Sequence, residues 1–294
     1  MTELERDIPV LDHRLATWRR VAVRLTSLLG LLLFGLVVGV VVTNVLGIIP
    51  SGSEGSPNDP PASAAALIGA DMPGESVHAA GAIGLLVIGV TSLVRLILRP
   101  ERSGAALQVL AVSTAWIVSV PLVGDPNNVG GQAGPVDPIF LAVALPSVAA
   151  GLLAVPWRLQ KTTATGDRRF LVLAAIAVLP ASWYAIDQAL MQRNTFPPTA
   201  DPHHNAHWWV MAIMALAVVL AVASAGLSSD GRAWVVLAGL AGVAFGLVSL
   251  LAPSSASAVR WPWGVATIAW SAVTLALLGR RFATRADHYK LRRA

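Results

Sequence analysis

Four of the six histidines in the chain fall in or beside two short segments, and imidazole both binds transition metals and titrates near neutral pH. His203, His204 and His207 lie within five residues of one another. Spacings of three and four residues place side chains on one face of a helix, where they can hold a single metal ion. Asp201 and Pro202 precede them in the pattern of a helix cap followed by a first-turn proline, so we expect a helix to begin there.

Three further side chains are candidates for the same site. His78 follows Glu75 by about one helical turn, and Asp187 is the one acidic residue inside a long apolar segment. A carboxylate within a membrane is costly and is therefore a candidate functional group. If these segments are neighbours, the three residues and the histidine triplet form one site for zinc, copper or iron. A narrower alternative is a haem b held by His78 together with His204 or His207.

These histidines also have simpler interpretations. They lie beside Trp208 and Trp209, and polar side chains next to tryptophan commonly anchor a protein at the headgroup level of a membrane. A cluster that binds protons rather than a metal is a further alternative, because histidine titrates near neutral pH.

The composition excludes a soluble protein. Of 294 residues, 55% are apolar and 13% are charged, and the charged share is about half that of an ordinary globular domain. The chain has no cysteine, which excludes disulfides, thiolate metal sites and cysteine nucleophiles. These values predict an integral membrane protein.

Runs of about 20 apolar residues predict an all-α, polytopic membrane protein with about eight transmembrane helices. The approximate spans are 21–48, 78–98, 105–124, 138–156, 169–191, 207–227, 232–252 and 261–279. The domain organisation that follows is a tail over 1–20, a transmembrane domain over 21–279 and a basic tail over 280–294.

The basic residues predict the orientation of these spans. Of the 21 Lys and Arg residues, 19 fall in the two tails and in alternate loops, while the opposite loops contain only Arg193 and Arg260. Basic residues concentrate on the cytoplasmic side, so both termini are expected to be cytoplasmic. The strong preference for arginine over lysine in a chain rich in Ala, Val and Gly is typical of a GC-rich bacterial genome. We therefore expect a multi-pass protein of the bacterial cytoplasmic (inner) membrane.

The partners expected from the sequence are membrane components. The bilayer surrounds the spans, and the basic C-terminal tail should attract anionic headgroups. No aromatic residues alternate with the basic ones there, so no nucleic-acid partner is predicted. Small residues recur at helix-packing spacing, as at Gly35 and Gly39 and at Gly242 and Gly246, and we expect these faces to pack within the molecule rather than against a second chain.

Three functions remain open from the sequence. The first is a histidine and carboxylate site at the extracytoplasmic membrane boundary that binds a transition metal or titrates during transport. The second is a non-catalytic accessory or scaffold subunit of a larger membrane complex. The third is an enzyme acting on a lipid-linked substrate at the outer leaflet, with Asp187 as general base. The nucleotide-binding, hydrolase-elbow and HExxH motifs are absent, so the sequence identifies no reaction and does not decide whether the protein is an enzyme.

Overall fold

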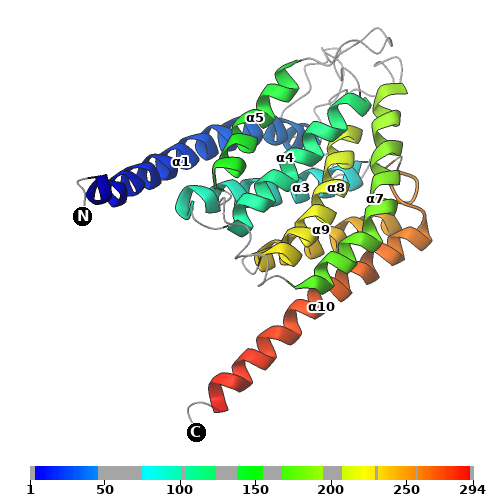
Figure 1. Ribbon diagram of the computed structural model, residues 1–294. Coiled ribbons are helices and arrows are strands. Elements are labelled where there is room, and N and C mark those ends of the chain that lie inside the picture. The colour runs from blue at the N-terminus through cyan, green and yellow to red at the C-terminus, as the bar shows by residue number, and fades with distance from the viewer. Residues whose placement is uncertain are drawn as a thin grey trace.

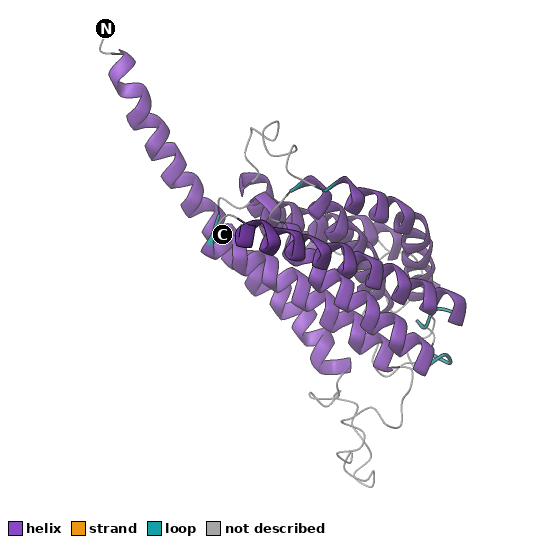
Figure 2. Cartoon of the chain, turned by 90° about the horizontal axis from the view of Figure 1, so that it is seen from below, coloured by secondary structure: helices purple, strands orange, loops and turns teal. Residues whose placement is uncertain are grey.

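The part of the chain that the structure describes is helical, with short connections between the helices (Figure 1, Figure 2). This computed structural model describes residues 4–45, 75–100, 103–123, 138–154, 167–194, 207–228, 231–255 and 257–291. The helices in these ranges are α1 (Leu4–Val45), α3 (Glu75–Leu98), α4 (Ser103–Val123), α5 (Pro138–Ala154), α7 (Arg168–Asn194), α8 (His207–Leu227), α9 (Arg232–Leu251) and α10 (Trp261–Leu291).

Among these helices, six are long and apolar enough to cross a membrane, as expected of a multi-pass membrane protein. Their candidate spans are Thr17–Gly39, Val77–Leu98, Arg168–Met191, Trp208–Leu227, Ala233–Leu251 and Trp261–Gly279. In α4 and α5, the apolar helical stretches Gly104–Ser119 and Ala144–Ala154 are shorter. Each of the spans expected from the sequence therefore overlaps a helix of the described part.

Two helices continue well beyond the apolar runs that predicted them. α1 begins at Leu4 and α10 ends at Leu291, so both segments expected as tails are largely helical (Figure 1). These extensions are rich in charged residues and contain no long apolar run. A search for apolar runs detects the membrane-crossing part of a helix and not the part that continues into water.

α8 is the central helix of the bundle. Of the residues in its apolar span, 72% are buried, compared with 28%, 17% and 22% in the spans of α1, α7 and α10. It packs against α3, α4, α7 and α9. A helix that is apolar on all sides is stable in such a central position, since every face meets another helix. The helices around it present one face to α8 or its neighbours and the other to lipid.

Contacts between helix ends show that neighbouring helices run antiparallel. Arg24, near the start of the α1 span, donates from Nε to the carbonyl oxygen of Ile97 at the end of α3, at 3.2 Å. Arg19 donates in the same way to Leu153 at the end of α5, at 2.6 Å. Because this end of the bundle carries these arginines, we call it the arginine end.

At the opposite end of the bundle, the start of α8 meets the end of α4. Trp209, at the start of α8, donates from Nε1 to the hydroxyl of Ser119 near the end of α4, at 2.7 Å. Trp209 also packs edge-on against Trp116, with 4.6 Å between ring centroids. The start of α3 lies at this end too and carries His78, so we call it the His78 end.

The small-residue faces differ in how they are used. In α9, a Cβ atom added to Gly246 would lie 2.9 Å from the carbonyl oxygen of Gly264 in α10, so the glycine permits close contact between these two helices. In α1, a Cβ added to Gly35 or Gly39 would meet nothing within 4 Å. The expectation of packing within the molecule therefore holds for the α9 face, whereas the α1 face has no such contact with the described part of the chain.

Candidate functional site

A hydrogen-bonded group of buried side chains joins three elements at the His78 end. His78 lies in the first turn of α3 and is 9% exposed, while Ser257, in the loop between α9 and α10, and Gln188, near the end of α7, are 0% and 1% exposed. His78 Nε2 lies 2.6 Å from the Ser257 hydroxyl, which in turn lies 2.6 Å from Gln188 Oε1. With Tyr184 and Asp187 of α7, these residues form what we call the His78 network.

The hydrogen bonds of the network run in one direction. The Ser257 hydroxyl has a single proton, and it donates that proton to Gln188 Oε1. His78 Nε2 must therefore carry a proton and donate it to the Ser257 oxygen. Gln188 Nε2 faces Asp187 Oδ2 in a long contact of 3.5 Å. A path of donors thus leads from the imidazole through the hydroxyl and the amide to the carboxylate.

α7 holds the α9–α10 loop at two points. Tyr184 donates its hydroxyl proton to the backbone carbonyl of Ser257 at 2.8 Å, and Gln188, four residues later on the same helix face, accepts from the Ser257 side chain. The ring of Tyr184 packs edge-on against Phe245 of α9 at 5.5 Å between centroids. These contacts fix the loop, and with it the serine that bonds to His78.

Asp187 differs from the rest of the network because its side chain is exposed. Its neighbours on the same face of α7 are apolar and exposed as well, including Trp183 at 78%, Ile186 at 43% and Leu190 at 44%. The carboxylate therefore lies at the outer surface of the bundle, about one turn before the end of the α7 span at Met191. From there it can contact lipid headgroups or water while touching the buried network through Gln188.

α8 also reaches the network. The ring of Trp208, in the first turn of α8, lies edge-on to the imidazole of His78 with 6.1 Å between centroids. α8 packs against both α3 and α7, which is the adjacency that the predicted site requires. The backbone of His207 precedes Trp208 directly, so one histidine of the predicted triplet begins a helix that contacts His78.

Most of the predicted metal ligands cannot be placed. His203 and His204 lie outside the described residues, as do the side chains of Glu75 and His207, although their backbones begin α3 and α8. Asp201 and Pro202, the expected helix start, also lie outside the described residues. Among the described residues, no group of three or more His, Asp or Glu side chains could hold a metal ion. The metal site therefore stays a prediction, while His78 and Asp187 do belong to one network.

Sequence reasoning missed the two residues that connect them. Ser257 lies 179 positions from His78, in a loop with several other serines, and no local pattern distinguishes it. Gln188 did carry a signal, because it is an amide in an apolar helix, next to Asp187 and four residues after Tyr184. Polar side chains in such helices usually bond across to a neighbouring helix.

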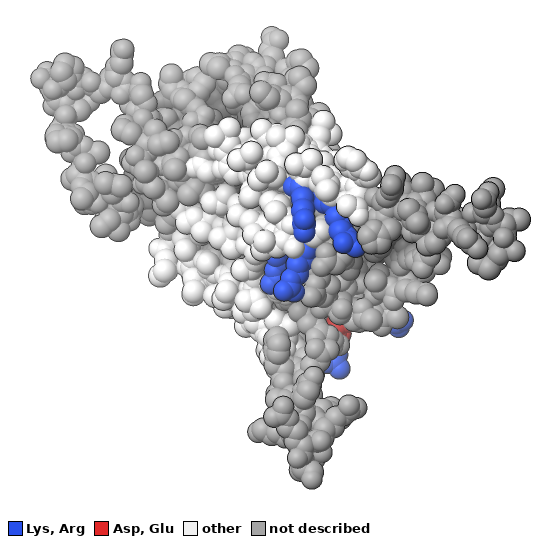
Figure 3. All heavy atoms as spheres, turned by 90° about the vertical axis from the view of Figure 1, so that its left-hand side faces the viewer, with Lys and Arg blue, Asp and Glu red and all other residues white. Residues whose placement is uncertain are grey.

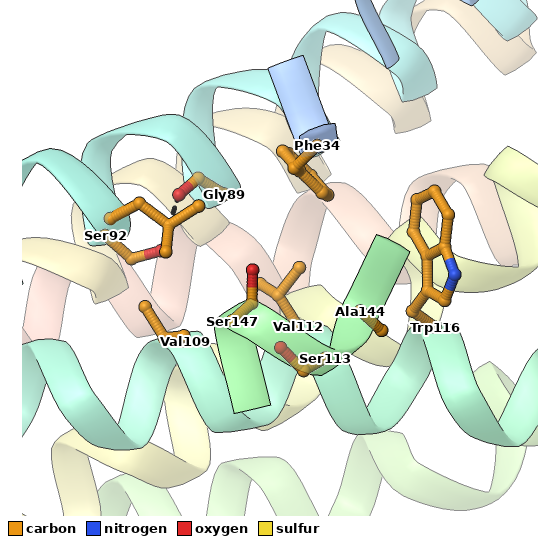
Figure 4. Close-up of a pocket in the computed structure, with 10 residues that line it drawn as sticks. Phe34, Gly89, Ser92, Val109, Val112, Ser113, Trp116, Ala144 and Ser147 are labelled. Carbon is orange, nitrogen blue, oxygen red and sulfur yellow. Dashed lines mark hydrogen bonds between the residues drawn. The ribbon is translucent and has the colours of Figure 1, made fainter. Parts of the chain in front are cut away.

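A separate pocket lies between α1, α3, α4 and α5 (Figure 4). Its walls include Trp116 and three serines, Ser92, Ser113 and Ser147. Ser92 donates to the carbonyl oxygen of Gly89 at 2.7 Å, and this is the hydrogen bond drawn between the lining residues (Figure 4). None of the lining residues belongs to the His78 network, so the pocket is not an entrance to it.

Comparison of the chain with protein families, with curated proteins and with solved structures found no match to any of them.

Replacing Ser257 with alanine tests whether the network holds the His78 end together. The substitution leaves the His78 donor and the Gln188 acceptor buried without their partner, so we expect the free energy of unfolding to fall by about 1–3 kcal/mol. Thermal unfolding of the detergent-solubilised protein measures the loss. Ser254→Ala is the matched control, because Ser254 is exposed in the same loop. Equal stability of the two variants would contradict the network.

Proposed function

We propose that the chain is a multi-pass protein of the bacterial inner membrane whose outer end holds a cation site that works in transport. The cation is a proton taken up at His78 or a transition-metal ion, namely zinc, copper or iron, bound by His203, His204 and His207 with His78, Glu75 and Asp187. The ion is either cargo or a cofactor. The observation that supports this proposal most directly is the path of hydrogen bonds from the buried His78 to the exposed Asp187.

The chemistry of the network supports a cation rather than an anion. Its ends are an imidazole and a carboxylate, and the polar atoms between them are a hydroxyl and an amide. A proton bound at His78 makes both ring nitrogens donors and adds a positive charge beside Trp208. Among the described side chains, the titratable groups in the elements around His78 are Tyr184 and Asp187 of α7, which reach it through Ser257 and Gln188, and Arg260, which is exposed in the α9–α10 loop.

The pairing of helix ends supports eight spans with both termini in the cytoplasm. The starts of α1, α7 and α9 and the ends of α3, α5 and α8 belong to the arginine end, in keeping with an alternation through every helix. Basic residues mark the cytoplasmic side, so the arginine end faces the cytoplasm and the His78 end faces outward.

Elemental analysis tests the metal form of the proposal. The untagged protein, purified without added metal or chelator, is measured by plasma mass spectrometry. We expect near-stoichiometric zinc, copper or iron in the native chain and none in the His203→Ala, His207→Ala double variant, because imidazole pairs at this spacing grip the ion. Metal retained in a folded double variant would contradict the site.

Tryptophan fluorescence tests the proton form. Protonated imidazole quenches a neighbouring indole, so the fluorescence of the native protein should change as pH is lowered, and the change should vanish in both Trp208→Phe and His78→Gln. Proteoliposomes with an internal pH-sensitive or zinc-sensitive dye then report transport, which should be slower for His78→Gln than for the native chain. Absence of bound metal, of the fluorescence change and of uptake would together refute the cation site.

Labelling of single cysteines tests the orientation. The native chain has no cysteine, so Ser53→Cys and Ser229→Cys each introduce a unique thiol, in the loop after α1 and in the loop after α8. In intact cells whose outer membrane has been permeabilised, a membrane-impermeant maleimide should label Ser53→Cys and not Ser229→Cys. The reverse pattern would show that the orientation is opposite to the proposed one. Equal labelling of both variants would contradict the alternation of spans.

A second candidate function is an accessory subunit of a membrane complex. It is favoured by the α1 face at Gly35 and Gly39, where a Cβ atom would meet none of the described residues within 4 Å. Close helix contact needs small residues, so Gly35→Leu with Gly39→Leu should release a partner that copurifies with the native protein in a mild detergent. Gly279→Leu is the control, because that glycine also has open space around it but lies outside the α1 face. Native mass spectrometry that finds only the monomer would count against this function.

A further inference from the structure

The arginine end carries two matched stripes of side chains on neighbouring helices. On α1, Arg20, Arg24, Leu28, Leu32 and Leu36 are exposed and follow one another at intervals of four residues. Successive residues at this spacing adjoin on the helix surface and are offset by about 40° around it, so the row winds slowly around α1. The stripe therefore changes from apolar to basic as it approaches the arginine end.

α3 repeats the pattern in the opposite chain direction. Ile83, Val87, Thr91 and Arg95 also recur every four residues, followed by Arg99 directly after the end of α3, and all are exposed or partly exposed. Ile83 and Val87 are 42% and 41% exposed, so the apolar part of the stripe meets lipid. Because α1 and α3 pack together and run antiparallel, both stripes become basic at the same end of the bundle.

Two contacts fix the arginines in place. Arg24 Nε bonds to the carbonyl oxygen of Ile97, which ties the guanidinium to the last turn of α3. The guanidinium of Arg95 lies 5.0 Å from the centroid of the Trp234 ring in α9. A guanidinium has five N–H donors, and each of these contacts occupies only one edge or face of it. Because the side chain is already held in place, less conformational entropy is lost when its remaining donors bind a ligand.

Few acidic side chains offset this charge. In the part of the chain whose side chains are described, the acidic residues are Asp167 and Asp187. Asp187 belongs to the His78 end, and Asp167 Oδ1 accepts from the backbone nitrogen of Arg169 at the start of α7. Figure 3 shows the basic side chains gathered on this face of the molecule. Among the described side chains, this surface is therefore positively charged and lies next to an apolar, lipid-facing surface.

We propose that this surface, formed by Arg20, Arg24, Arg95 and Arg99 with the apolar parts of the two stripes, binds one anionic phospholipid. The planar guanidinium fork matches the non-bridging oxygens of a phosphodiester, and the acyl chains lie along Leu28, Leu32, Ile83 and Val87. The order of charges and apolar groups along α1 and α3 is the order of headgroup and chains in a phospholipid. This inference does not depend on the cation site.

Thermal unfolding in lipid–detergent micelles tests it. The native protein is titrated with phosphatidylglycerol, with phosphatidylcholine and with inorganic phosphate, and the rise in Tm is followed. We expect phosphatidylglycerol to raise the Tm with a saturable dependence, while the zwitterionic lipid and inorganic phosphate have little effect. The same rise with inorganic phosphate would show an anion site without a lipid and would overturn the proposal.

Matched double variants test the location. Arg20→Gln with Arg99→Gln removes two charges without removing the contacts of Arg24 and Arg95, and it should raise the half-saturating fraction of phosphatidylglycerol about tenfold. Arg168→Gln with Arg169→Gln removes the same charge at the same end, from α7, and should leave that fraction nearly unchanged. Equal weakening in both variants would mean that phosphatidylglycerol responds to overall charge and not to this site. A folded Arg20→Gln, Arg99→Gln variant with native binding would also refute it.

Discussion

Hydrocarbon offers no partner to a peptide group, so every backbone donor and acceptor within a membrane must be paired inside the protein. This constraint accounts for the long helices of the described chain and leaves only their ends unsatisfied. The last four carbonyl groups of a helix have no partner in that helix. Two arginines of α1 bond to such groups, Arg19 at Leu153 in α5 and Arg24 at Ile97 in α3. The basic residues that indicate orientation in the sequence therefore also complete the hydrogen bonding of neighbouring helices.

The same constraint governs the polar side chains within the bundle. Ser257, Gln188 and His78 are almost fully buried, and each has its partner in a different element of the fold. Trp209 and Ser119 pair between α8 and α4 in the same way. A polar group that has no alternative partner in lipid restricts where its helix can pack. These pairs thus position helices whose remaining contacts are between apolar and small side chains.

The positions of the helices could be predicted from the sequence because each span is a continuous apolar run. The candidate site could be predicted only in part. His78 and Asp187 were expected to lie near each other, since both are polar groups at the same predicted boundary. Their connection through Ser257 could not be predicted, because it depends on how the α9–α10 loop docks between α3 and α7. The open face at Gly35 and Gly39 could not be predicted either, because GxxxG spacing is the same whether a partner is present or absent.

The direction of the hydrogen bonds in the His78 network gives Asp187 an influence on the distant imidazole. If the Gln188 amide turned over, its oxygen would face the Asp187 carboxylate, and two acceptors would oppose each other. An ionised Asp187 therefore selects one amide orientation, which in turn selects the hydroxyl direction at Ser257 and the protonated nitrogen of His78. The orientation of one amide beside the exposed Asp187 is thus linked, through the Ser257 hydroxyl, to the position of the proton on the buried imidazole.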